Sequence, residues 1–320
     1  MTRYLVRRLL QAIPLLFAVI ALTFVLIHVA PGDPVHILAG DGGDAAYYAS
    51  MRSKFGLDRP LPEQLVIYVG SALRGDFGYS YVQRRPVFDV ISDRIPATAL
   101  LMLSALSVST LLGLLLGTAA ARRFGRPTDH AITIATLVGG ATPAFWLGQV
   151  LVLVFAARLG WFPVQGMTSA RGVAPGIDAV IDLLRHLVLP VATLGFLQLA
   201  LITRITRNGL IDALREDYIR TAYAKGLPPS TVVSRHALRN VLLPVVTIVG
   251  SHFGTLLTGA VLTEIIFAWP GLGRLLFDAT TSRDYPLLMA MFLVASLSVI
   301  VANLITDIAY TLLDPRVRLT

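Results

Sequence analysis

Long apolar blocks separated by short charged segments set the pattern of this chain. Six blocks cover residues 9–30, 97–121, 131–157, 186–206, 241–262 and 287–313. Each is long enough to cross about 30 Å of hydrocarbon as a helix. In block 131–157, Gly139, Gly140 and Pro143 predict close packing or a kink, because neighbouring helices can satisfy the freed backbone groups. The pattern therefore predicts an all-α membrane protein with six transmembrane helices.

The polar stretch between the first two blocks is too long to be a turn. Residues 31–96 carry acidic and basic side chains in nearly equal number. We interpret them as a small helical extracytoplasmic subdomain inserted between the first and second transmembrane helices. The chain then divides into a cytoplasmic N-terminus with the first span (1–30), this subdomain (31–96) and a core of five spans (97–320).

Composition and charge strengthen the membrane interpretation. The chain is 55% hydrophobic and only 14% charged, whereas soluble domains are about 25% charged. Its formal net charge is +8, and arginines gather beside the apolar blocks, as the positive-inside rule requires of cytoplasmic segments. This distribution fits membrane topology better than nucleic-acid binding, and it predicts that both termini lie in the cytoplasm. The basic start resembles a signal peptide, but no clear cleavage site follows, so we expect a retained first span.

Two polar segments between spans have distinctive features. The cytoplasmic segment 207–240 contains two short helical runs, separated by Gly226 and by Pro228 and Pro229. A short basic helix–turn–helix held between two spans offers a surface on which a partner outside the membrane can push. On the other side, the apolar stretch 265–276 is too short to cross and is broken by Pro270, which predicts a re-entrant or interfacial hook.

Several kinds of chemistry are missing from the sequence. The only lysines are Lys54 and Lys225, and neither stands in the frame of a phosphate-binding P-loop. The six histidines show no metal-ligand spacing, no nucleophile elbow is present, and the chain has no cysteine. In the last span, Asp307 is either a helix-pairing group or a proton carrier, and we favour helix pairing. We therefore expect no enzyme, no metal site and no energy source within this chain.

Five stretches resemble a known family of transporters. Residues 217–226 (DYIRTAYAKG), followed by 235–240 (RHALRN) and Pro244, resemble the cytoplasmic motif of type I ABC importer permeases. Stretches 28–34 (HVAPGDP), 143–148 (PAFWLG), 267–274 (FAWPGLGR) with 283–286 (RDYP), and 313–316 (LDPR) agree with the dipeptide, oligopeptide and nickel subfamily. The likeness covers nearly the whole chain with the motifs in the same order. One departure is that Arg220 and Thr221 stand where the broader family has Glu-Ala, and Glu216 does not inherit that glutamate's role.

The resemblance implies a fold and a set of partners. The fold is that of a type I ABC importer permease, which pairs with a second homologous permease in the lipid bilayer. Two ATPase subunits, or one fused ATPase, dock on the cytoplasmic side of the permeases and hold the ATP and magnesium. On the other side of the membrane, an extracytoplasmic binding protein delivers substrate. The residues implied in ATPase coupling are Glu216, Asp217, Tyr218, Thr221, Ala222, Lys225, Gly226, Arg235, His236 and Asn240.

Within that segment the resemblance implies distinct roles. A helix over residues 216–225 would present side chains to a groove on the ATPase. Gly226 would leave the helical basin so that the second run can fold back, and Arg235, His236 and Asn240 would brace the turn. The alternative is a plain basic loop that touches anionic lipid, which would need no such ordered spacing.

The hook and the overall function also have alternatives. Trp269, Pro270, Gly271, Leu272 and Gly273 would line the outer gate or contact the binding protein, or else form an interfacial aromatic anchor. The predicted function is the permease subunit of an ATP-driven importer of peptides or a similar small solute. The alternatives are an ion-gradient-driven carrier that works without an ATPase and, less well supported, an ATP-driven exporter. Dipeptide, oligopeptide, glutathione, nickel chelate and sugar all stay open as substrates.

Overall fold

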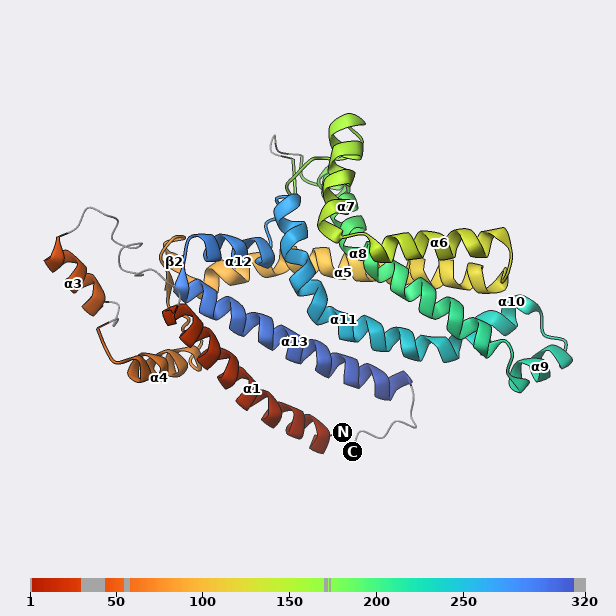
Figure 1. The fold of residues 1–320 in the computed structure, drawn as a ribbon, viewed down its shortest axis with the longest axis horizontal. Helices are drawn as coiled ribbons and strands as arrows, with labels where there is room; N and C mark the ends of the chain where they lie inside the picture. Colours follow the sequence, from red (N-terminus) through yellow and green to blue (C-terminus); the bar gives the residue numbers. More distant parts are fainter. Residues whose placement is uncertain (1, 30–43, 55–57, 170–171, 173, 314–320) are drawn as a thin grey trace. The chain divides into compact units, whose positions relative to one another are not determined.

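The chain folds into two compact helical units (Figure 1). The computed structural model describes residues 2–29, 44–54, 58–169, 172 and 174–313. Unit 1 consists of Met1–Pro96 and Gly271–Ile300, and unit 2 of Ala97–Pro270 and Val301–Thr320. The motifs at 28–34 and 313–316 lie mostly outside the described residues.

Unit 1 combines helices with one short β-hairpin. Its elements are α1 (Thr2–Val29), α3 (Ala45–Lys54), α4 (Leu61–Ala72), β1 (Tyr79–Ser80), β2 (Arg85–Pro86), the start of α5 (Val87–Arg122), α12 (Leu272–Thr281) and most of α13 (Tyr285–Leu313). The two strands pair antiparallel, with Tyr79 opposite Pro86. The hairpin was not predicted, and α5 begins ten residues before the predicted second span.

The early start of α5 has a simple cause. Val87, Val90 and Ile91 are buried in a core that includes Leu275 of α12 and Leu287 of α13. These three positions lie on one face of a helix, so the polar residues between them face outward. Because polar residues are frequent in this stretch, the sequence predicts that the polar segment continues to residue 96, although the stretch is amphipathic.

A buried carboxylate fixes the hairpin of unit 1. Asp284 is only 1% exposed. It accepts hydrogen bonds from the Ser80 hydroxyl and from the Val82 backbone N–H, the latter at 3.2 Å. Burial, together with the nearby Asp284 carboxylate, raises the pKa of Tyr81 to about 12. Contacts between residues so far apart in sequence leave no local signal in the chain.

Unit 2 is arranged around one long helix. Its elements are the rest of α5, α6 (Pro127–Ala141), α7 (Ala144–Leu151), a π-helical segment (Val152–Arg158), α8 (Ile177–Ala213), α9 (Asp217–Ala224), α10 (Pro229–Thr231), a second π-helical segment (Val232–Ala237) and α11 (Leu238–Ile266). Helix α8 packs against α6, α7 and α11. It begins at Ile177, nine residues before the predicted span 186–206.

Glycines bring α5 and α8 into direct contact. A Cβ atom at Gly113 would lie 2.7 Å from Ile202 Cγ2, and one at Gly117 would lie 2.6 Å from Thr206 Cβ. From the other helix, a Cβ atom at Gly195 would lie 3.1 Å from the Ala105 carbonyl oxygen. Gly113 and Gly117 form a Gly-xxx-Gly pair, the spacing that lets two membrane helices approach closely.

The helices that could cross a membrane match most of the predicted spans. Among the described residues they are Val87–Arg122, Ile177–Ala213, Pro229–Gly250 and Tyr285–Ile308. The pair Pro127–Ala141 and Ala144–Arg158 makes a fifth if it is counted as one span, and Leu10–Val25 is a shorter apolar helix. The total of six spans stays a prediction.

The third predicted span is bent and not straight. Its two halves, α6 and the helix from Ala144, meet at 106°. Thr142 is extended, with φ −83° and ψ 122°, as expected for a residue that precedes a proline. Pro143 therefore divides the predicted span into two helices at a sharp angle, where the sequence predicted only a kink in one helix.

We expect Gly117→Ala to destabilise the α5–α8 contact, because the added methyl group would lie 2.7 Å from the Thr203 carbonyl oxygen. Thermal unfolding of the purified protein should show a lower midpoint. The matched control is Gly140→Ala, since no atom lies within 4 Å of a Cβ atom there and alanine favours the helix by up to about 1 kcal/mol. Equal midpoints for both variants would contradict the proposed contact.

Candidate functional site

The predicted coupling segment forms a short helix fixed by its apolar face. Helix α9 buries Ile219 and Ala222, which are 1% and 5% exposed. They belong to a core that also contains Val232, Val233 and Ala237 from the following π-helical segment. The spacing of Ile219 and Ala222, three residues apart, places both on one side of the helix. Ala222 therefore holds α9 in place and does not present a surface to a partner.

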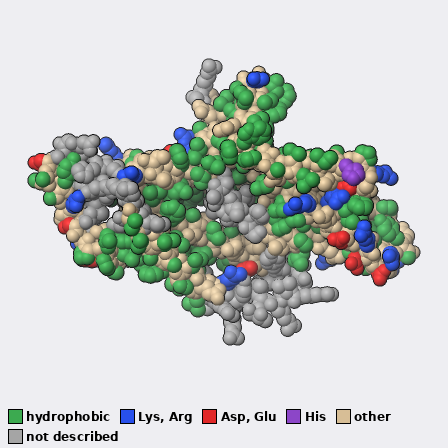
Figure 2. All heavy atoms as spheres, in the orientation of Figure 1, with side chains coloured by type: hydrophobic (Ala, Val, Ile, Leu, Met, Phe, Trp, Pro, Cys, Tyr) green, Lys and Arg blue, Asp and Glu red, His purple; other side chains and the backbone are tan. Residues whose placement is uncertain are grey.

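The opposite side of α9 is open to solvent. Glu216, Asp217, Thr221 and Lys225 are exposed. Tyr218 and Tyr223, next to the buried Ile219 and Ala222 in sequence, flank the buried side and are also exposed, at 40% and 44%. Charged side chains gather around α9, α10 and the α5–α6 turn of unit 2, while hydrophobic side chains dominate the surface of its long helices (Figure 2).

Gly226 ends α9 in a glycine cap. Its φ of 76° lies in the left-handed region, which confirms the prediction that it leaves the helical basin. The Leu227 N–H donates to the Ala222 carbonyl and the Gly226 N–H to the Tyr223 carbonyl, the two hydrogen bonds of a Schellman motif. The cap turns the chain back on itself, so the helical segment that begins at Pro229 packs against α9.

Asn240 joins α9 to the base of α11. Its Nδ2 donates to the hydroxyl of Tyr218 at 2.6 Å, which connects the start of α9 to α11. Arg235 is exposed and His236 is half-buried on the second π-helical segment. For all three residues the bracing of the Gly226 turn stays a prediction. The helical backbone continues from Pro229 through that segment into α11, so the second run is the beginning of the next span.

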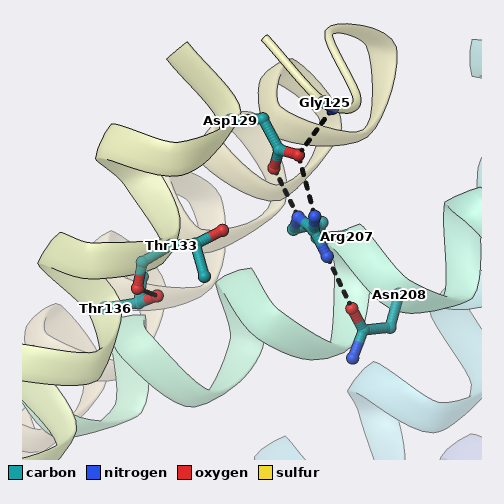
Figure 3. Close-up of polar contacts among 6 residues, drawn as sticks. All are labelled: Gly125, Asp129, Thr133, Thr136, Arg207 and Asn208. Carbon is teal, nitrogen blue, oxygen red and sulfur yellow. Dashed lines mark hydrogen bonds and ion pairs between the residues drawn. The ribbon is translucent and has the colours of Figure 1, made fainter. Parts of the chain in front are cut away.

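An ion pair that the sequence analysis missed fixes the nearby end of α8. Asp129 at the start of α6 is 1% exposed and accepts hydrogen bonds from Nε and Nη2 of Arg207 in α8, the second at 2.8 Å (Figure 3). The Gly125 N–H donates to the same carboxylate at 3.0 Å, and the Arg207 guanidinium lies 5.5 Å from the centre of the Phe124 ring. In the sequence, the only indication of this ion pair is an acidic residue, Asp129, at the start of an apolar helix.

The predicted hook has its own buried contacts. Trp269 is completely buried in unit 2, and its indole N–H donates to the Ala97 carbonyl at 2.9 Å. Nearby, Glu264 is also completely buried and accepts a hydrogen bond from the Thr98 hydroxyl at 2.7 Å. In this conformation the Trp269 side chain is available neither to an external protein nor to a membrane interface.

The rest of the hook is also withdrawn from solvent. Pro270 is half-buried, while Gly271, Leu272 and Gly273 are buried. Leu272 begins α12 and packs in the core of unit 1. The part of the chain that the structure describes contains no group of three or more His, Cys, Asp or Glu residues that could hold a metal ion.

Comparison with known proteins gives consistent matches over the whole chain. Residues 113–319 match the family described as "Binding-protein-dependent transport system inner membrane component", and residues 1–102 match the N-terminal model of the same kind of membrane component. A solved structure of the MetNI methionine ABC transporter in an inward-facing conformation has a TM-score of 0.55 at 14% identity, covering 70% of this chain and 96% of that chain. This likeness supports the fold alone.

Curated relatives are similar over nearly their full length. The chain is 42% identical to the di/tripeptide transport system permease protein DppB of Pseudomonas aeruginosa, with 99% of both chains covered. It is 41% identical to the glutathione transport system permease protein GsiC of Escherichia coli, again with 99% of both covered. It is 39% identical to the oligopeptide transport system permease protein AppB of Bacillus subtilis, covering 99% of this chain and 100% of that one.

We expect Asp129→Leu to destabilise unit 2, because it leaves the Arg207 guanidinium without its carboxylate. Breaking a buried pair costs about 3–5 kcal/mol, and the cost here should be at the low end because the Arg207 side chain is 20% exposed. The double variant Asp129→Leu/Arg207→Met should recover most of the loss in thermal unfolding. Asp217→Ala, which removes an exposed pair with Arg220, serves as the control and should leave the midpoint unchanged. Strictly additive single and double effects would contradict this coupling.

Proposed function

Because the chain belongs to the family of binding-protein-dependent transport system inner membrane components, we propose that its α9 helix is the docking site for an ATPase subunit. The chain itself is a multi-pass permease subunit of an ATP-driven importer and not an enzyme. The observation that carries the proposal is the asymmetry of α9: its apolar face is fixed in the core, while its polar face and the two tyrosines beside the core are exposed. A lipid-binding loop would need neither the fixed core nor the glycine cap.

The connections of α9 suggest how docking moves the membrane helices. On one side α9 follows α8 after a short turn, and on the other Gly226 leads into the helical segment that continues as α11. The buried Ile219 and the Tyr218–Asn240 hydrogen bond hold α9 against that segment. A displacement of α9 by a closing ATPase therefore reaches α8 and α11 together. Such a displacement is a rigid-body step between two states.

The proposed assembly has four kinds of component. A second homologous permease pairs with this chain, two ATPase subunits or one fused ATPase bind ATP and magnesium, and an extracytoplasmic binding protein supplies the solute. Both termini and the segment 207–240 lie in the cytoplasm, as the arginine distribution favours. The residues of the hook, from Trp269 to Gly273, would line the outer gate once the transporter changes state.

The relatives narrow the substrate class. Their names specify di/tripeptides, glutathione and oligopeptides, all of which are short chains joined by amide bonds. We therefore assign this chain to the import of short peptides or peptide-like solutes. A carrier driven by an ion gradient is not favoured, since the relatives are components of binding-protein-dependent systems.

We expect Gly226→Val to abolish uptake of a labelled di- or tripeptide by cells that contain the complete transporter. A β-branched residue at a φ of 76° is strained by about 1–2 kcal/mol, so the cap opens and the docking face of α9 is no longer held in position. Co-purification of the ATPase subunits should fall, while the amount of permease in the membrane stays the same.

The matched control is Gly75→Val. Gly75 ends α4 in the same kind of cap, with a φ of 81° and no atom within 4 Å of a Cβ position. Its substitution imposes a similar backbone strain outside the proposed docking segment and should leave ATPase co-purification intact. Normal uptake and normal co-purification by Gly226→Val would overturn the docking proposal.

A further inference from the structure

A cavity lies between α6 and α8 in unit 2. Its volume is about 610 Å³, within the range of pockets that bind small molecules. Its walls are mostly apolar and include Leu137 and Gly140 of α6 and Leu197 of α8. No atom lies within 4 Å of a Cβ position at Gly140, so this part of the wall is open.

One end of the cavity is polar and cationic. Arg204 and Asn208, both exposed, line this end together with Arg207. The charge of Arg207 is matched by Asp129 (Figure 3). Within the described ranges, Arg204 forms no ion pair, so its charge is available to an anion. The Thr133 hydroxyl, one turn along α6 from Asp129, is buried and has no hydrogen-bond partner among the described residues.

The length of the cavity corresponds to one leaflet of a bilayer. Its lining on α8 runs from Leu197 to Asn208, which is about 16 Å at 1.5 Å per residue. Half of a hydrocarbon core of about 30 Å is about 15 Å. The cationic end lies beside the arginine-rich turn after α5, which the positive-inside rule assigns to the cytoplasm.

We propose that this cavity binds an anionic phospholipid of the cytoplasmic leaflet. One acyl chain occupies the apolar part beside Leu137 and Gly140, and the phosphate lies at Arg204 and Asn208. Thr133 lines the cavity near the level of the glycerol esters. Basic pockets between membrane helices on the cytoplasmic side recognise anionic headgroups in this way. The proposal depends on the cytoplasmic orientation of this end and not on ATPase docking.

The test uses the assembled transporter in nanodiscs that contain phosphatidylglycerol and phosphatidylcholine, followed by native mass spectrometry of the lipids that stay bound after extraction. The wild type should retain phosphatidylglycerol in preference to phosphatidylcholine. Arg204→Gln should lower that retention about fivefold, the effect of one arginine near a membrane surface. Gly140→Leu should also lower it, because the leucine side chain fills the place of the acyl chain while every charge remains.

Arg126→Gln is the matched control. Arg126 is an exposed arginine in the adjacent turn and does not line the cavity, so retention should be unchanged. Equal retention of the two lipids by the wild type, or an Arg204→Gln variant that retains as much phosphatidylglycerol as the control, would overturn the proposal.

A second measurement separates lipid from the partner permease as the occupant. The chain has no cysteine, so Leu137→Cys gives a single reactive thiol in the cavity. This thiol should react with a lipid-soluble maleimide in the assembled transporter, and added phosphatidylglycerol should slow the reaction. Efficient cross-linking of Leu137→Cys to the second permease, with no effect of the lipid, would show that a protein helix fills the cavity and would refute the lipid site.

Discussion

The close contact between α5 and α8 is the constraint on which unit 2 depends. In a bilayer, lipid chains are as apolar as leucine side chains, so the hydrophobic effect does not hold helices together. Their association relies on tight packing and on polar contacts. Gly113 and Gly117 supply the tight packing, and the Asp129–Arg207 pair supplies a polar contact on another side of α8. Because α8 leads directly to α9, these contacts also determine where the exposed surface of the coupling segment lies.

The coupling segment shows how a helix of eight residues can keep a defined position. A helix this short is marginal in water by itself, since each end leaves unsatisfied backbone groups. Here the Gly226 cap satisfies carbonyls at one end, and Ile219 and Ala222 attach one face to the core. Asn240 adds a hydrogen bond from a distant position to Tyr218. The helix is therefore stabilised by its surroundings more than by its own sequence.

The sequence allowed much of this architecture to be predicted, and the failures have a common physical cause. Apolar block lengths located five of the helical regions well, and the residue pattern at Gly226 predicted its left-handed turn, because both features are local. The 106° bend at Thr142, the hairpin held by Asp284 and the Asp129–Arg207 pair were not foreseen. Each depends on residues brought together from separate helices, or on how a proline break is resolved by neighbouring helices. Periodicity and motif spacing carry no information about such contacts.

Two groups of buried polar side chains in unit 2 join separate helices, and these contacts bear on how the helices move. Glu264, Thr98 and Trp269 form one group, and Asp129 with Arg207 forms the other. A polar group in an apolar interior is costly to leave without a partner, so these contacts cannot slide gradually: they are either formed or replaced by other partners. Discrete polar contacts at separate places on a packed helical unit favour movement of whole helices between two defined arrangements.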